Sequence, residues 1–195
     1  MPGSITDKAS LRRAILARRD AFAAPDRDDA TRHITEQLLR LSEFDSAGSV
    51  LAYLSFGSEY DTTEFVAAIL ARGKSLVLPR VNRQQRRLEV FLVTDLACDV
   101  ASGIWGIREP RPDRCLPAET ARIGLILAPG VAFTSHCDRL GYGGGFYDGL
   151  LSQWTHPRPA VIAAAFGLQI VDALPMGPTD VPVDMVVTED ALYRR

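Results

Sequence analysis

The amino-terminal segment carries apolar side chains at the spacing of a helix. Apolar positions recur every three or four residues between residues 7 and 22 and again between residues 26 and 41. This period places the apolar side chains on one face of each segment, so both segments are predicted to be amphipathic helices. Pro25 lies between the two patterns and predicts the turn that joins them.

Short apolar runs alternate with helical patterns in the rest of the chain. The apolar runs lie at residues 49–54, 75–78, 87–93, 123–128, 160–166 and 184–188, and the helical patterns lie at residues 61–71 and 146–154. Runs that are apolar throughout are typical of parallel strands that are buried on both faces. The alternation predicts a layered α/β domain, and a length of 195 residues fits one domain that spans residues 1–195.

Two regions of this predicted domain are expected to matter for function. Residues 95–120 are rich in glycine, proline and charge, so we expect a long ordered loop there. Parallel sheets bind ligands beyond the carboxyl ends of their strands. We therefore expect the site near the segments that follow Leu54, Leu78, Leu127 and Phe166.

Charge and cysteine content exclude several classes of protein. The net charge is -2 and the pI is about 5.9, whereas dedicated nucleic-acid binders are usually strongly basic, so no nucleic-acid partner is expected. Cys98, Cys115 and Cys137 form an odd set without C-x-x-C spacing, which argues against a disulfide framework and a structural zinc site. Charges interrupt the amino-terminal segment and no apolar run could cross a membrane, so we expect a cytoplasmic protein.

The strongest chemical signal is a glycine-rich segment between an apolar run and a helical pattern. It reads Arg139-Leu140-Gly141-Tyr142-Gly143-Gly144-Gly145-Phe146-Tyr147-Asp148, with four glycines in five positions. Because glycine lacks Cβ, backbone N–H groups can approach an anion closely. Arg139 could hold a phosphate, and Asp148 could bind Mg²⁺, which prefers oxygen ligands beside substrate phosphates. A plain turn tightened by glycine is the alternative.

This segment does not match the two standard nucleotide motifs. Phe146 stands where the dinucleotide-binding pattern G-x-G-x-x-G requires its third glycine. The pattern G-x-x-x-x-G-K-[ST] occurs nowhere in the chain. The sequence therefore supports neither a Rossmann domain nor a P-loop.

Other charged residues could act at the same site. Lys8 and Arg12 are one helical turn apart and could present two cations to a triphosphate, although many such faces are only solvated. Glu59 follows an apolar run, where a carboxylate could bind an amine-rich heterocycle or be an ordinary loop acid. Asp180 and Asp184 precede the last apolar run, where one could join a metal site or both could cap turns.

The histidines give no catalytic or metal-binding pattern. His136 and Cys137 are neighbours, and neighbouring side chains in an extended chain point to opposite sides, so they cannot form a nucleophile pair. His33 and His156 lack metal-ligand spacing and are expected to be structural or solvated. Trp105 could stack on a planar ligand or only pack within its loop.

Several segments, in order along nearly the whole chain, resemble one enzyme family. They are Lys8-x-x-Leu11-Arg12, Leu54 with Glu59, Gly106-Ile107-x-Glu109-Pro110, Pro129-Gly130-Val131-Ala132-Phe133, the glycine-rich segment, and Asp180-Val181-Pro182-Val183-Asp184. Together they are similar to 5-formyltetrahydrofolate cyclo-ligase, also called 5,10-methenyltetrahydrofolate synthetase. The glycine-rich segment is the most specific part of the resemblance.

The resemblance implies a fold and a reaction. The implied fold is a three-layer α/β/α sandwich with a mostly parallel central sheet. The implied reaction is the ring closure of a small-molecule substrate, 5-formyltetrahydrofolate, to 5,10-methenyltetrahydrofolate, with ATP and Mg²⁺ as cofactors and with release of ADP and phosphate. Phosphorylation of the formyl oxygen would turn a poor leaving group into phosphate before N10 attacks, so the protein would mainly position groups and neutralise charge. A monomer is expected.

The resemblance also implies roles for individual residues. ATP would be held by Lys8, Arg12, Arg139, Leu140, Gly141, Tyr142, Gly143, Gly144, Gly145, Phe146 and Tyr147. The folate would contact Leu54, Glu59, Tyr142, Gly143, Gly144, Gly145 and Phe146. Asp148 and Asp180 would bind Mg²⁺, and Arg139 and Tyr147 are the residues expected to act in catalysis.

The chain departs from the usual pattern of the family at four positions. Gly149 replaces an arginine, Thr134 an aspartate, Cys137 a glycine and Thr179 what is often a histidine. The missing arginine at Gly149 would remove a charge near ATP, which another arginine such as Arg80 or Arg108 could supply.

Two other functions stay open, and Gly149 and Thr134 motivate the first of them. One is a folate- or nucleotide-binding paralogue without catalysis. The other is a sugar-phosphate isomerase on a related fold, which would leave Lys8 and Arg12 unexplained.

Overall fold

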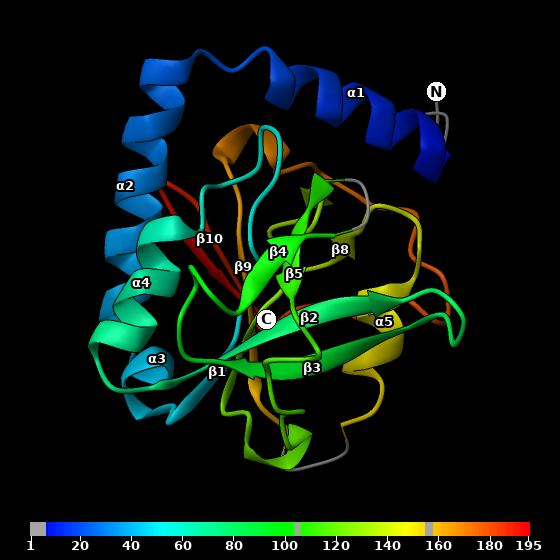
Figure 1. Ribbon diagram of the computed structural model, residues 1–195. Coiled ribbons are helices and arrows are strands. Elements are labelled where there is room, and N and C mark those ends of the chain that lie inside the picture. The colour runs from blue at the N-terminus through cyan, green and yellow to red at the C-terminus, as the bar shows by residue number, and fades with distance from the viewer. Residues whose placement is uncertain (1–6, 104–105, 155–157) are drawn as a thin grey trace, which may run out of the picture.

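The computed structural model describes residues 7–103, 106–154 and 158–195, which form a layered domain around a seven-stranded sheet (Figure 1). The sheet has the order β11-β10-β9-β6-β1-β2-β3. Its strands are β1 (Ser49–Leu51), β2 (Ser75–Asn82), β3 (Arg87–Val93), β6 (Leu125–Leu127), β9 (Ala160–Ala164), β10 (Met185–Val187) and β11 (Leu192–Arg194). Neighbouring strands from β10 to β2 are parallel, and only the edge strands β3 and β11 pair antiparallel. The predicted mostly parallel sheet is therefore confirmed.

Helices cover both faces of this sheet. They are α1 (Lys8–Asp20), α2 (Ala24–Arg40), α3 (Ser42–Ser46), α4 (Thr63–Ala71) and α5 (Phe146–Leu151), with 3-10 turns η2 (Thr120–Arg122) and η3 (Gly167–Gln169). Figure 1 shows α2, α3 and α4 together on one side, α5 on the other, and α1 lying across one end. The three-layer α/β/α sandwich is confirmed. Pro25 was expected in the turn before the second helix but lies in the first turn of α2. Proline is tolerated there because the N–H groups of the first turn have no partner within the helix.

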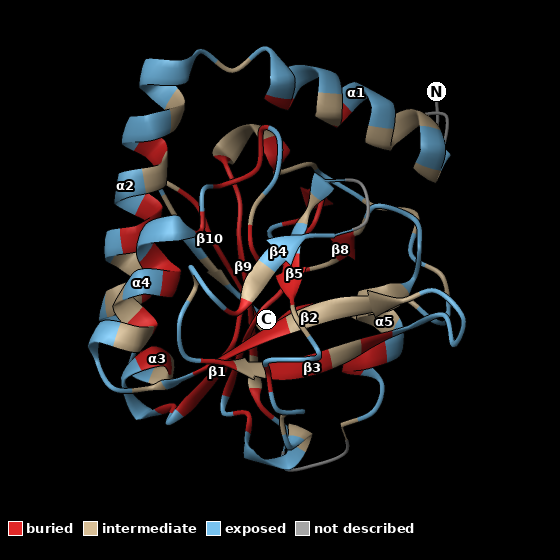
Figure 2. Cartoon of the chain, viewed as in Figure 1, coloured by how far each residue is buried: buried red, intermediate tan, exposed pale blue. Residues whose placement is uncertain are grey.

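Two cores result from the alternation of side chains along the strands. Val50 and Leu76 face the core shared with α2 and α4, whereas their neighbours Leu51 and Val77 face the core shared with α5. In Figure 2 the sheet is largely buried and the outer faces of the helices are exposed. Strands buried on both faces are apolar throughout, which is why they were visible in the sequence.

The strand β2 is longer than predicted. The apolar run ends at Pro79, but β2 continues to Asn82, and Pro79 pairs with Val90 of β3. The other neighbour, β1, pairs with β2 only as far as Val77. Among the residues that the structure describes, Pro79 pairs with β3 alone, so no second strand requires the N–H that proline lacks.

Residues 95–120 are not the single long loop that we expected. They contain a hairpin of β4 (Val100–Ser102) and β5 (Arg108–Pro110). The Glu109 side chain of β5 accepts a hydrogen bond from the backbone N–H of Val81 at 3.1 Å, which ties the hairpin to β2. Strands of three residues are too short to show a period in the sequence, so the loop prediction was wrong here.

A second small sheet connects α1 to the glycine-rich segment. It consists of β7 (Ala132–Phe133) and β8 (Arg139–Leu140), which pair antiparallel. Ile15 of α1 packs in one buried cluster with Val131, Ala132 and Leu140. This packing brings the amino-terminal helix, which carries Lys8 and Arg12, beside a segment more than a hundred residues later in the chain.

Candidate active site

One cavity of about 1200 Å³ lies where α1, the glycine-rich segment and the end of β1 meet. It is lined by every residue to which the family resemblance gave a role in binding or catalysis: Lys8, Arg12, Leu54, Glu59, Arg139, Leu140, Gly141, Tyr142, Gly143, Gly144, Gly145, Phe146, Tyr147, Asp148 and Asp180. Three of the four expected strand ends border it, through Phe56, Pro79 and Pro129. The segment after Phe166 does not line it, and the N–H of Gly167 is bound by Glu189 instead.

Two cations of α1 reach the glycine-rich segment and its neighbourhood. Asp7 caps α1 by accepting hydrogen bonds from the N–H groups of Ala9 and Ser10, at 2.9 and 3.0 Å. The first turn then carries Lys8, whose ammonium forms an ion pair with Asp180. One turn later, Nε of Arg12 donates to the backbone oxygen of Gly141 at 2.7 Å. The helical spacing read from the sequence thus places both cations at one wall of the cavity.

The glycine-rich segment has a backbone conformation that other residues rarely adopt. Gly143 has φ +102° and Gly145 has φ +69°, both in the region that side chains disfavour. Gly143 also lies against the Arg12 guanidinium, whose central carbon would be 3.4 Å from an added Cβ. The segment is therefore bare backbone beside two cations, a setting suited to phosphate oxygens.

Arg139 is a buried cation at the base of this segment. Its Nη2 donates to Asp148 Oδ1 at 2.6 Å and its Nη1 to the Pro129 oxygen at 3.3 Å. Burial lowers the pKa of Arg139, and Asp148 opposes that change. Within the described part of the chain, Nε of Arg139 and the hydroxyl of Tyr147 are buried without a hydrogen-bond partner. Such orphaned polar atoms lining a cavity are suited to binding a polar ligand.

The two predicted metal ligands lie on the same cavity, and each is also paired with a base. Asp148 accepts from Arg139 and, at 3.0 Å, from the N–H of Val181. Burial tends to raise the pKa of Asp180, but the Gly177 N–H and Lys8 lower it below its usual value. No group of three or more His, Cys, Asp or Glu among the described residues is arranged around a metal position. Two carboxylates nevertheless fit Mg²⁺, which takes its remaining ligands from water and substrate phosphates.

Glu59 lies at another wall of the cavity and is almost completely enclosed. Its Oε1 accepts a hydrogen bond from the Tyr142 hydroxyl, and its Oε2 accepts one from the N–H of Phe56 at 3.0 Å. Burial raises the pKa of Glu59, while Tyr142, the Phe56 N–H and Arg19 oppose the rise. A buried carboxylate with aromatic neighbours is suited to recognising a flat ring that carries N–H donors.

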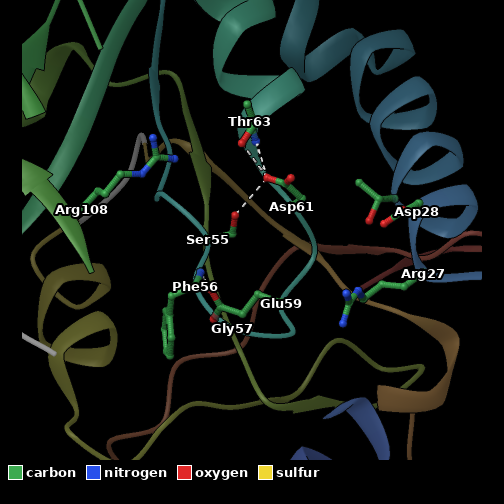
Figure 3. Close-up of a pocket in the computed structure, with 10 residues that line it drawn as sticks. Arg27, Asp28, Ser55, Phe56, Gly57, Glu59, Asp61, Thr63 and Arg108 are labelled. Atoms are coloured by element: carbon green, nitrogen blue, oxygen red, sulfur yellow. Dashed lines mark hydrogen bonds between the residues drawn. The ribbon is translucent and has the colours of Figure 1, made fainter. Parts of the chain in front are cut away.

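A smaller hollow of about 310 Å³ adjoins the cavity on the far side of Glu59. The two share Phe56, Glu59 and Arg108 as lining residues. Figure 3 shows Arg27 and Arg108 on opposite sides of this hollow. It also shows Asp61 accepting hydrogen bonds from Ser55, at 3.2 Å, and from Thr63, which braces the loop that carries Glu59.

Sequence reasoning missed the apolar wall of the cavity. This wall comes from β2, β3 and the segment before β5, and consists of Leu78, Pro79, Val81, Leu88 and Ile107. Val81 and Leu88 face each other across the β2–β3 ladder. Their proximity depends on that pairing, and the polar residues Arg80 and Asn82 flank Val81 in the sequence, so no local apolar run indicated this wall.

The four departures from the family pattern divide into two groups. Gly149 and Thr179 line the cavity, whereas Thr134 and Cys137 lie in the turn between β7 and β8. Cys137 has φ +67°, a conformation that glycine adopts more easily, which accounts for the family's preference at this position. Arg108, one of the two arginines considered as a substitute, lines the cavity.

Other candidates from the sequence lie away from the cavity. Asp184 braces β9 by accepting from the N–H of Val161 at 2.8 Å and from Arg158. His33 and His136 are exposed, and Cys137 beside His136 is buried. Trp105 and His156 lie outside the described residues.

Comparison with known proteins decides the family. Residues 4–189 match the model of the 5-formyltetrahydrofolate cyclo-ligase family. The chain belongs to this family. An Escherichia coli 5-formyltetrahydrofolate cyclo-ligase is 27% identical over 92% of this chain and 98% of its own length. The Aquifex aeolicus 5,10-methenyltetrahydrofolate synthetase structure has a TM-score of 0.84 and 30% identity, covering 96% of this chain and 92% of its own.

A second solved structure extends the likeness in fold. It is a 5,10-methenyltetrahydrofolate synthetase from Mycoplasma pneumoniae, with a TM-score of 0.74 and 23% identity, over 94% of this chain and 99% of that one. Membership of the cyclo-ligase family makes this chain an enzyme that acts on a folate. It also excludes the alternative of a sugar-phosphate isomerase. No helix in the described ranges is long and apolar enough to cross a membrane.

Proposed function

We propose that this chain converts 5-formyltetrahydrofolate to 5,10-methenyltetrahydrofolate with ATP in the 1200 Å³ cavity. The observation that carries the proposal is that Lys8, Arg12 and Arg139 share this cavity with the bare glycine backbone and with Glu59. These groups come from three distant parts of the chain. A cavity with cations at one wall and a buried carboxylate at another suits two substrates that meet in the middle.

ATP is assigned to the wall formed by α1 and the glycine-rich segment. Arg12 lies against Gly141 and Gly143, so its guanidinium and the backbone N–H groups would face the same phosphates. Nε of Arg139 and the hydroxyl of Tyr147, which have no hydrogen-bond partner among the described residues, would complete the set of donors. Their contribution to catalysis would be to hold the charge that develops on the transferred phosphoryl group.

Mg²⁺ is assigned to Asp148 and Asp180. Their carboxylate oxygens are the ligand type that Mg²⁺ prefers, and both residues line the cavity next to the predicted phosphate position. The ion would neutralise phosphate charge during the transfer. Lys8 and Arg139, which now pair with these carboxylates, would then be free to turn their donors toward phosphate oxygens.

The folate is assigned to the wall that carries Leu54, Glu59 and the aromatic rings of Phe56 and Tyr142. These two rings are 5.5 Å apart at their centroids and are both partly exposed to the cavity. Glu59 would accept hydrogen bonds from the amino-substituted ring, as its buried position favours a well-defined contact. Once the formyl oxygen has become a phosphate ester, closure by N10 and loss of phosphate need only correct positioning.

Turnover of the wild-type protein tests the proposal. Purified protein incubated with 5-formyltetrahydrofolate and MgATP is expected to form the absorbing methenyl product together with an equal amount of ADP. Omission of ATP is the control and should abolish product. Ligand binding without either product would instead identify the non-catalytic paralogue.

The location and the oligomeric state stay predictions. Cys98, Cys115 and Cys137 are all free thiols, which supports a reducing compartment such as the cytoplasm. Microscopy of a tagged chain and light scattering of the purified protein would test the expected cytoplasmic monomer.

A further inference from the structure

Arg19 is a buried cation near the end of α1 for which the proposed reaction has so far required no role. Only 3% of its surface is exposed. Its Nε donates to the Ser58 hydroxyl oxygen at 3.1 Å, and its guanidinium carbon lies 5.8 Å from the centroid of the Tyr142 ring. Ser58 in turn donates to Asp20. Within the described ranges Arg19 forms no direct ion pair with a carboxylate.

Such a side chain is costly if its only purpose is to fill space. Removing a charge from water costs several kcal/mol, and close ion pairs usually offset part of that cost. An apolar side chain of similar volume would pack at this position without the penalty. An arginine at this buried position is therefore expected to have a role that depends on its charge.

That reason lies in what Arg19 contacts. The Arg19 guanidinium lies over the Tyr142 ring, which lines the cavity, and the Tyr142 hydroxyl donates to Glu59. Ser58, which anchors Arg19, is the residue directly before Glu59 in the same loop. Arg19 thus contacts Tyr142 of the folate wall and, through Ser58, the loop that carries Glu59, and Arg19 is not among the residues that line the cavity.

We propose that Arg19 is a positioning residue for folate recognition, which holds Tyr142 and the Glu59 loop in place and keeps Glu59 ready to accept hydrogen bonds. The proposal rests on the assignment of Glu59 to the folate. In this role Arg19 acts through Tyr142 and Glu59 and does not itself contact the substrate.

The charges around Glu59 support this role. The titratable and charged groups that face Glu59 are Arg19 of α1, Tyr53 after β1, Tyr142, Tyr147 of α5, and Arg27, Asp28, Asp61 and Arg108 of the adjoining hollow. Burial raises the pKa of Glu59, and Arg19 is the cation that opposes the rise. Loss of Arg19 would therefore raise the pKa of Glu59 further, and a protonated carboxyl cannot accept hydrogen bonds with both oxygens as a carboxylate does.

Arg19→Met tests the proposal, with Arg19→Lys as the conservative variant and Arg18→Met as the control, because Arg18 is exposed on the same helix. We expect Arg19→Met to raise KM for 5-formyltetrahydrofolate roughly 10- to 100-fold, the range for a lost hydrogen bond to a charged group. KM for ATP and kcat should change less than about twofold. Arg19→Lys should recover part of the loss, and Arg18→Met should behave as wild type.

The pH profile separates this role from a purely structural one. Because Glu59 would ionise at higher pH in Arg19→Met than in wild type, the defect in folate KM of this variant should shrink as the pH rises. The wild-type profile should be flatter. An unchanged folate KM in folded Arg19→Met, or an equal loss for both substrates at every pH, would overturn the proposal.

A second variant covers the case in which Arg19→Met does not fold. Ser58→Ala keeps the cation but removes its anchor, and is expected to raise folate KM selectively while thermal unfolding stays cooperative. No selective effect in folded Ser58→Ala would count against Arg19. Absence of turnover in the wild type would reject the proposed function, whereas calorimetric titration of 5-formyltetrahydrofolate into the variants would still decide the role of Arg19.

Discussion

Replacement of Asp148 by alanine removes the charged partner of a buried arginine. The side chain of Arg139 is 2% exposed and that of Asp148 is 22% exposed, with 2.6 Å between Nη2 and Oδ1. Breaking a buried pair by removing one partner typically costs 3–5 kcal/mol, and the partial exposure of Asp148 places this case near about 3 kcal/mol. For a chain of this length, such a loss lowers Tm by roughly 6–12 °C.

Asp148→Asn separates stability from chemistry. The amide oxygen can still accept from Arg139 and from the Val181 N–H, so about 1–2 kcal/mol of destabilisation is expected. Turnover should nevertheless be lost, because a neutral amide is a poor Mg²⁺ ligand. Urea denaturation of the two variants and of wild type measures the free energy of unfolding. If Asp148→Ala lowered the free energy of unfolding by less than about 1 kcal/mol, the buried ion pair would not stabilise the fold as expected.

Three further substitutions test other parts of the site. Gly149→Arg should raise the free energy of unfolding by about 1 kcal/mol, because arginine favours a helix more than glycine does and an added Cβ meets no described atom within 4 Å. The added charge should also lower KM for ATP, and an unchanged Tm would contradict the stability prediction. Gly144→Ala places a Cβ 2.7 Å from the Phe146 ring, so ATP affinity should fall in a folded protein, while Gly149→Ala should bind ATP normally. Burial raises the pKa of Glu59, so the folded state loses stability as pH rises through that pKa. The Tm of Glu59→Gln should therefore rise relative to that of wild type as the pH increases from about 5 to about 8, and the variant should bind folate more weakly. If the difference in Tm did not change with pH, Glu59 would not be a buried group that ionises in this range.

The parts of the fold that could be predicted from sequence are those with their own local signal. The helices α1 and α2 repeat apolar residues at the helical period, and the central strands are apolar throughout because both faces are buried. The glycine-rich segment was visible because three consecutive glycines beside Arg139 and Asp148 are unusual in a plain turn. In each case the information lies within a few consecutive residues.

The parts that were missed depend on partners distant in sequence. The strands β7 and β8 have two residues each, and β4 and β5 have three, so none of them shows a period. The cavity wall of Val81 and Leu88 exists only because those residues pair across β2 and β3. The role of Arg19 likewise depends on the packing of α1 against the Tyr142 and Glu59 loops. The sequence places Arg19 on the helix face that carries Lys8 and Arg12, but it does not show its contacts with Ser58 and Tyr142.

We propose above all that the amino-terminal helix and the glycine-rich segment hold one triphosphate between them. Steady-state kinetics of Arg12→Met, with the exposed Arg13→Met as control, tests it most directly. We predict that KM for ATP rises roughly 10- to 100-fold in Arg12→Met while KM for 5-formyltetrahydrofolate stays unchanged. Wild-type KM for ATP in a folded, active Arg12→Met protein would contradict the account.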